Sequence, residues 1–239
     1  MTISTTTHVS MQEIKRNITS FNPPISLDVD YLYRLANVAK RPNDLMRLVR
    51  FAMFLNHSAL QQFIWALLKD EQKMLKFVTL PASGSHHHAY PGGLLEHSLD
   101  VALLSYQWLR DMPEVSINEQ ELTLCAALLH DFGKVITMTV EQGYTPMGYA
   151  VQHDELTIAS LEPYFSELAR NWPEGASALA YMLTWHHRKG HAKYATALIV
   201  KSADQVSAAI NRRNAAFANK PDHYYYQKLP NEGCLLRVG

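Results

Sequence analysis

One dipeptide, His130-Asp131, constrains this chain more than any other feature of its sequence. It ends the apolar run from Ala126 to Leu129, and Phe132-Gly133-Lys134 follows it directly. An apolar helix seldom ends in two side chains that bind metal unless they are used for that purpose. The dipeptide therefore predicts a metal site at the end of a buried helix, and the fold must bring further ligands to it.

Side chains of the same chemical types recur on both sides of this dipeptide. One imidazole lies upstream, and further imidazoles and a carboxylate lie downstream, each in or beside a segment with helical periodicity. Together they supply enough ligands for two adjacent divalent ions. The candidate metal ligands are His97, His130, Asp131, His153, His186, His187 and Asp204.

Apolar residues recur at steps of three and four along most of the chain, which is typical of helices that bury one face. The stretch from Thr79 to Gly93 is instead rich in Pro, Ser, Gly and His, and it separates two helical blocks. We therefore expect a mainly all-α fold, a helical bundle with an N-terminal helical subdomain. The predicted boundaries are a flexible arm over 1–26, the subdomain over 27–78, the main domain over 79–215 and a tail over 216–239.

One segment interrupts the helical pattern of the main domain. The run from Val135 to Val140 and the segment from Tyr144 to Val151 flank Glu141-Gln142-Gly143, which has the composition of a turn. This arrangement favours a short β-hairpin, or an irregular excursion, inserted between two helices.

The charge and cysteine content exclude several classes of protein. Lys plus Arg and Asp plus Glu each number 22 among the 239 residues, so no overall field attracts nucleic acid. Binding to a strand must then depend on a local basic track, and the candidates for it are Arg188, Lys189, Lys193 and Lys201. The two cysteines do not suggest a disulfide framework, and no apolar run is long enough to span a bilayer. We expect a soluble cytoplasmic protein without a membrane partner.

The ligand types indicate the chemistry. Hydrolysis of a phosphoester at neutral pH needs an activated water and neutralisation of the charge that develops on the phosphoryl oxygens, and two adjacent metal ions supply both. A mixed imidazole and carboxylate set suits Mn, Fe, Ni, Co, Zn or Mg, and Asp131 can bridge two ions through its two oxygens. Any single one of the 12 histidines is as readily a surface or hydrogen-bonded core residue, but the ordered set favours a metal centre.

This motif set resembles that of the HD-domain metal-dependent phosphohydrolases, in which a helical His precedes His-Asp-x-Gly-Lys, and further His residues and a late Asp follow. The resemblance covers about Gly93 to Asn211. It implies that Lys134 contacts a substrate phosphate. Neighbouring helical residues point about 100° apart, so the choice between His186 and His187 stays open. The implied ligands are His97, His130, Asp131 and Asp204 for one ion, and Asp131, His153 and His186 or His187 for the other.

A narrower resemblance lies in Leu80 to Leu99, which is similar to the HD domain of TraI-type relaxases of the MobH class. Those enzymes also carry a triple histidine just before the first HD helix. The resemblance implies a single-stranded DNA substrate and a conjugative DNA-transfer complex as partner. The relaxases are usually far longer, so we leave open whether this chain is a fragment or a stand-alone relative.

The triple histidine has two interpretations. His86, His87 and His88 either bind or protonate the scissile phosphate, or they organise the loop through hydrogen bonds to its backbone. Their position directly before the helix of His97 favours the first. We expect Asp131, Lys134 and His88 to take part in catalysis, and His86, His87, Lys134 and Arg188 to bind substrate.

Three functions therefore compete. The first is a divalent-metal phosphodiesterase that acts on nucleic acid, with single-stranded DNA preferred. The second is a phosphohydrolase of small nucleotides, or a 3′-5′ exoribonuclease of the YhaM type, which shares the order His, His-Asp, His-His. The third is a non-catalytic module that binds metal for stability. The cyclic-dinucleotide branch is disfavoured, because Arg188-Lys189-Gly190-His191 stands where its signature should follow His186-His187.

Overall fold

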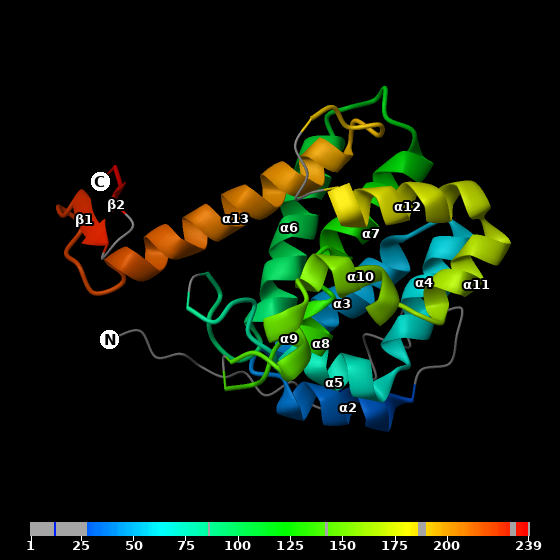
Figure 1. Cartoon of the computed structure of the whole chain (residues 1–239), viewed down its shortest axis with the longest axis horizontal. Helices are drawn as coiled ribbons and strands as arrows, with labels where there is room; N and C mark the ends of the chain where they lie inside the picture. The colour runs from blue at the N-terminus through cyan, green and yellow to red at the C-terminus, as the bar shows by residue number, and fades with distance from the viewer. Residues whose placement is uncertain are drawn as a thin grey trace.

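The computed structural model describes residues 12, 28–85, 87–141, 143–185, 190–229 and 233–238. Most of these residues are helical, as the periodicity predicts (Figure 1). The helices are α2 (Val29–Val38), α3 (Pro42–Phe54), α4 (Ser58–Leu68), α5 (Glu71–Thr79), α6 (Gly93–Leu109), α7 (Ile117–Leu129), α8 (Lys134–Thr137), α9 (Pro146–Ala150), α10 (His153–Ser160), α11 (Tyr164–Asn171), α12 (Pro173–Trp185) and α13 (Ala197–Phe217).

Helix starts follow from local chemistry in several places. The Asp70 and Ser116 side chains accept hydrogen bonds from the amides of Lys73 and Glu119, which caps α5 and α7. Pro42 occupies the first turn of α3, where a missing amide proton costs nothing. These caps fix where the helices that lead to the candidate site begin.

The helix pair α6 and α7 lies at the centre of the fold, and α13 packs across both. The buried apolar side chains form one continuous cluster that runs from Tyr31 in α2 to Ala203 in α13. The first helices are tied to this centre by Glu121, whose buried carboxylate accepts hydrogen bonds from the amides of Asn56 and His57 at the start of α4. The division at residues 78 and 79 stays a prediction, since both blocks share this cluster.

The prediction of a hairpin over Val135 to Val151 is wrong in its detail. This segment holds α8, a single antiparallel bridge between Met138 and Tyr144, and α9. Thr145 caps α9 by accepting from the amide of Gly148, which turns the second half into a helix. Among the described residues, the only two-stranded sheet is formed by β1 (Tyr226–Leu229) and β2 (Gly233–Leu236), in the tail. Figure 1 shows this hairpin at the far end of α13, away from the helical body.

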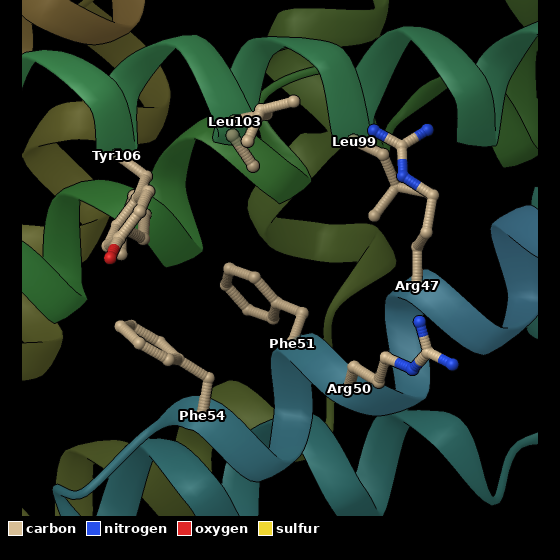
Figure 2. A pocket seen from close by; sticks show the side chains of 9 residues that line it. Arg47, Arg50, Phe51, Phe54, Leu99, Leu103 and Tyr106 are labelled. Atoms are coloured by element: carbon tan, nitrogen blue, oxygen red, sulfur yellow. The ribbon is translucent and has the colours of Figure 1, made fainter. Parts of the chain in front are cut away.

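An apolar hollow lies between α3 and α6. Figure 2 shows Phe51 and Phe54 from α3 opposite Leu103 and Tyr106 from α6, with Arg47 at one end. Arg47 extends towards α6, where its guanidinium pairs with Asp100 at 3.3 Å. The same helix α6 therefore carries both this contact and the candidate ligand His97.

Across the part of the chain that the structure describes, no helix has both the length and the apolar character needed to cross a lipid bilayer.

Candidate metal centre

Four helices bring candidate ligands to one place. His97 lies in the second turn of α6, His130 ends α7 and is followed by Asp131, His153 begins α10, and Asp204 lies in α13. The side chains of His97, His130 and Asp131 are buried. The structure thus brings together five of the seven candidate ligands, from segments more than a hundred residues apart.

The carboxylate of Asp131 lies at the middle of this group. Its Oδ2 is 3.4 Å from His130 Nε2 and 3.6 Å from His97 Nε2, while its Oδ1 is 3.0 Å from His153 Nε2. Asp204 Oδ1 closes the group at 3.1 Å from His97 Nε2 and 3.7 Å from His130 Nε2. The two oxygens of Asp131 therefore face different imidazoles, which is the arrangement that a bridging carboxylate needs.

The outer nitrogens of two imidazoles are held by the fold. His130 Nδ1 lies 2.9 Å from the carbonyl oxygen of Ala127, and His97 Nδ1 lies 3.2 Å from Ser207 Oγ. A carbonyl only accepts, so His130 must carry a proton on Nδ1. If Nε2 is unprotonated, its lone pair faces the carboxylate oxygens and is repelled by them. A proton on Nε2, or a cation between Nε2 and the oxygens, removes this repulsion. This donor set fits a divalent ion. An ion that displaced the proton between these groups would find ligand atoms on His97, His130, Asp131 and Asp204.

The pKa values of the group reflect this crowding of charge. Burial alone lowers the pKa of His130, but the carboxylates of Asp131 and Asp204 outweigh it and raise that pKa to about 10. Burial raises the pKa of Asp131, yet Lys134 and His130 hold it well below its usual range. Burial likewise raises the pKa of Asp204, but hydrogen bonds from His130 and His97 outweigh burial, so the net effect lowers this pKa. In the metal-free protein, a proton on His130 therefore stands where an ion would stand.

Lys134 is a buried cation directly beside the group. Its Nζ lies 2.5 Å from Asp131 Oδ2. It also lines a pocket of about 180 Å³ together with His153 and Ser83. Lys134 thus both pairs with the candidate ligand Asp131 and lines the neighbouring pocket.

The described histidines of the triple-histidine loop differ from each other, while His86 lies outside the described residues. The His87 ring is 4.9 Å from that of His97, and one of its nitrogens lies within 4.8 Å of candidate ligand atoms on His97 and Asp204. Burial, followed by electrostatic repulsion from His97 when that ring is protonated, lowers the pKa of His87 to about 4, so His87 is neutral at neutral pH. His87 is therefore as close to the centre as an additional ligand would be.

His88 lies beside His97, with 5.1 Å between the ring centroids, but its Nε2 faces a different carboxylate. It is buried with a φ of 46°, and its Nε2 lies 3.7 Å from Asp100 Oδ2. The amide of His88 donates to Asn211 Oδ1 at 2.8 Å, which fixes this left-handed conformation. His88 thus faces a carboxylate other than those of the metal centre, and its predicted part in catalysis remains a prediction.

A glycine controls how closely α10 approaches the centre. A Cβ atom on Gly133 would overlap the carbonyl oxygen of His153. The amide of Gly133 also donates to Thr157 Oγ1 at 3.3 Å, and Thr157 Oγ1 lies 3.0 Å from the carbonyl of His153. Gly133 therefore allows the start of α10 to bring His153 against Asp131.

The start of α6 is a simple junction rather than an anion site. Gly92 has a φ of 82°, as a tight turn requires. The amides of Gly92, Gly93 and Leu94 donate to the carbonyls of Thr79, Tyr90 and Leu80, so none of these three is available for a phosphate.

Three predicted site residues, His186, His187 and Arg188, lie outside the described residues, as does Lys189. Next to them, Trp185 is buried and its ring lies under Lys201 Nζ at 5.3 Å. Trp185 is therefore a core residue rather than an exposed platform for a base, and Lys201 of the proposed basic track covers it.

Sequence reasoning missed Ser207, Asn211 and Thr157. The first two follow Asp204 by three and seven positions on α13, and residues at this spacing share one helix face. That spacing could have indicated that Ser207 and Asn211 face the candidate site together with Asp204. Thr157 carried no comparable signal, because its role depends on how Gly133 meets α10.

The comparisons with known proteins agree with this geometry. Residues 94–209 match the family described as HD domain. The 3′-5′ exoribonuclease YhaM of Bacillus subtilis (strain 168) is 24% identical over 219 residues, which cover 87% of this chain and 67% of that enzyme. YhaM of Listeria monocytogenes serotype 4b (strain CLIP80459) is 28% identical over 145 residues, 60% of this chain and 44% of the relative. No solved structure matches the chain.

These matches correct the narrower expectation from the sequence. The relatives are exoribonucleases, so the resemblance to conjugative relaxases is not supported. The chain spans less than half the length of the Listeria enzymes that it matches, 44% in the case above. The wider resemblance is confirmed over residues 94–209, which match the HD domain family.

Proposed function

We propose that this protein is a divalent-metal-dependent phosphodiesterase that shortens single-stranded RNA from its 3′ end. The observation that carries the proposal is the meeting of His97, His130 and His153 around the carboxylates of Asp131 and Asp204. Buried imidazoles and carboxylates of this kind are costly unless a cation balances them. An HD domain uses such a set for phosphoester hydrolysis.

We assign the ligands as follows. His97, His130, Asp131 and Asp204 would hold one ion, and Asp131 and His153 would hold a second. His186 or His187, outside the described residues, would complete the second set. Such ions, drawn from Mn, Fe, Ni, Co, Zn or Mg, would supply an activated water and neutralise the developing phosphoryl charge.

The protein groups around the ions have separate tasks. Ser207 and the carbonyl of Ala127 orient the imidazoles of His97 and His130, so that their Nε2 atoms face the ions. Lys134 lines the pocket beside His153, and we assign it to a non-bridging phosphate oxygen. The pKa of His87, lowered by burial and by His97, keeps this group neutral and able to accept a proton at the edge of the site.

The choice of RNA rests on the relatives and on the shape of the site. The relatives are exoribonucleases, which favours RNA over single-stranded DNA. The pocket at Lys134 and His153 measures about 180 Å³, below the range of ~300 to 1,000 Å³ typical of small-molecule sites. A pocket of this size suits the end of a strand better than a whole free nucleotide with its phosphates.

A panel assay tests the proposal. Protein stripped with a chelator and reloaded with each metal is incubated with 5′-labelled single-stranded RNA, DNA of the same sequence, nucleotides, cyclic dinucleotides and bis(p-nitrophenyl) phosphate. We expect a ladder of RNA products shortened from the 3′ end, and no ladder without metal. Faster cleavage of the DNA at one internal position would overturn the proposal in favour of a relaxase-like nuclease. Bound metal without turnover of any substrate would favour a non-catalytic module.

A further inference from the structure

Two exposed tyrosines stand beside the candidate metal centre. Tyr144 is 48% exposed and Tyr149 is 79% exposed, and their ring centroids lie 5.6 Å apart in an edge-to-face arrangement. We call Tyr144 and Tyr149 the aromatic shelf. Large aromatic side chains this exposed, and this close together, are typical of a binding surface rather than of a folded core.

The shelf is held by the backbone that carries it. Thr145 Oγ1 donates to the carbonyl of Ile136 at 2.8 Å, and the amide of Thr145 donates to the carbonyl of Thr137 at 3.0 Å. Gly148 approaches so closely that a Cβ there would overlap the carbonyl oxygen of Thr137. The segment is therefore clamped to α8, and the shelf is preorganised rather than formed on binding.

The shelf is continuous with the metal centre. Tyr144 and Gly148 line the same pocket of about 180 Å³ as Lys134 and His153. Helix α8 contacts both α9, which carries Tyr149, and α10, which carries His153 (Figure 1). Tyr144 thus lines the pocket itself, and its ring contacts that of Tyr149 next to it.

The charges of this region restrict what the shelf can bind. No Lys or Arg lies between Lys134 and Arg170 in the sequence, while Glu141, Asp154 and Glu155 do. The segment itself therefore offers no Lys or Arg side chain to pair with phosphates. Stacking of bases on aromatic rings needs no charge and tolerates any base, so it remains as the means of attraction.

We propose that Tyr144 and Tyr149 stack successive bases of a single-stranded nucleic acid whose end lies in the pocket at the metal centre. The inference rests on the proposed phosphodiesterase and deepens it. It gives the enzyme a preference for strands over isolated phosphodiesters, and it makes that preference independent of sequence and weakly dependent on salt.

The test compares two substrates in three variants. Tyr149→Ala and Tyr144→Ala are assayed on single-stranded RNA and on bis(p-nitrophenyl) phosphate, which has no strand to stack. We expect each variant to raise KM for RNA roughly five- to a hundredfold, as the loss of one stacked base does. Tyr149 does not line the pocket, so Tyr149→Ala should retain kcat and leave turnover of the small substrate unaffected. The matched control is Tyr225→Ala, a tyrosine 69% exposed in the tail, which leaves both substrates unchanged.

Two further measurements separate stacking from other roles. Tyr149→Phe keeps the ring and is expected to restore the KM for RNA. Anisotropy of a labelled RNA over a range of salt should give weaker binding by Tyr149→Ala with the same slope of log Kd on log salt, because no charge is lost. An equal loss of activity on both substrates, an unchanged KM for RNA, or a change in oligomeric state would overturn the inference.

The inference and the proposed function fail differently. If the wild type cleaves no oligonucleotide in any metal, the proposed function is wrong. If it cleaves RNA and the shelf variants bind RNA as the wild type does, only the inference is wrong.

Discussion

Two clusters of histidine and carboxylate side chains lie side by side along α6, and only one of them has all the features of a metal centre. The first contains His97, Asp131 and Asp204, and the second contains His88, Glu96 and Asp100. By distance alone, each cluster holds a group of three side chains that could hold an ion.

The counter-charges distinguish the two clusters. In the second, Glu96 pairs with Arg41 and accepts a hydrogen bond from Tyr90 at 2.8 Å, and Asp100 pairs with Arg47 at 3.3 Å. In the first, the cations among the described residues are Lys134 and the imidazole of His130, whose pKa is raised to about 10. An arginine is permanently charged and cannot make way for a metal ion as a proton does. Residue types at the right distance therefore do not make a metal centre unless the positive charge beside them can be displaced.

The largest expected effect comes from removing the central carboxylate of the first cluster. Asp131→Ala should lower kcat by at least ~10³-fold, since ions that stabilise the transition state by several kcal/mol lose their shared ligand. Metal content measured by mass spectrometry should fall with it. Asp44→Ala, which removes a buried carboxylate paired with Arg47, is the control and should keep its metal. Full activity of Asp131→Ala would contradict the assignment.

Gly133→Ala should give the next largest effect. The new methyl group must displace the carbonyl of His153, which we expect to destabilise the fold by about 1–3 kcal/mol. It should also lower activity, because His153 moves away from Asp131. Denaturant unfolding and the panel assay measure both quantities. Gly233→Ala, at a tail glycine with open space around it, should reduce stability through its positive φ alone and leave activity intact.

Metal binding should release protons in the first cluster. The carboxylates raise the pKa of His130 to about 10, so this group is protonated in metal-free protein at about pH 8 and must lose its proton to an ion. Titration calorimetry with Mn²⁺ in buffers of different ionisation enthalpy should therefore give different heats. Equal heats in all buffers would contradict this. The raised pKa also stabilises the metal-free fold below the ordinary value of about 6.5, and that stabilisation is lost as pH rises through about 10.

The smallest effect is expected in the second cluster. Burial raises the pKa of Asp100, but hydrogen bonds from His88 and Arg47 outweigh it and lower that pKa. A carboxyl whose pKa is lowered in the folded state stabilises the fold at pH values above its unfolded pKa of about 3.9. This stabilisation is lost as pH falls through the folded pKa. Asp100→Asn should therefore weaken the loss of stability in acid. Because Asp100 is partly exposed, the change at neutral pH should stay below about 1 kcal/mol, with metal content unaltered.

The fold class and the centre of the first cluster could be predicted from the sequence. Helical periodicity places His97 on the buried face of its helix, and His130 ends an apolar helix, so both lie in the core; Asp204, partly exposed, meets them from α13. The Ser116 side chain caps α7, as a serine before an apolar helix predicts, whereas α4 begins after His57, which makes no side-chain cap hydrogen bond. Local patterns thus predict where helices run better than where each one begins.

The rest depended on contacts between distant parts of the chain. His88 faces Asp100 because its amide is bound by Asn211, which lies 123 residues later. The excursion after Lys134 forms helices because the hydroxyl and amide of Thr145 donate hydrogen bonds to the carbonyls of Ile136 and Thr137. Neither partner can be recognised from the local sequence, so the loop and the excursion had to be read from the structure.

The most direct test of the account is to locate the ions. Crystals grown with Mn²⁺ and measured at the manganese absorption edge should show anomalous peaks between His97, His130, Asp131 and Asp204, and between Asp131 and His153. The second cluster, held by Arg41 and Arg47, should show none. A peak among His88, Glu96 and Asp100, or no peak at Asp131, would contradict the claim that displaceable charge selects the metal centre.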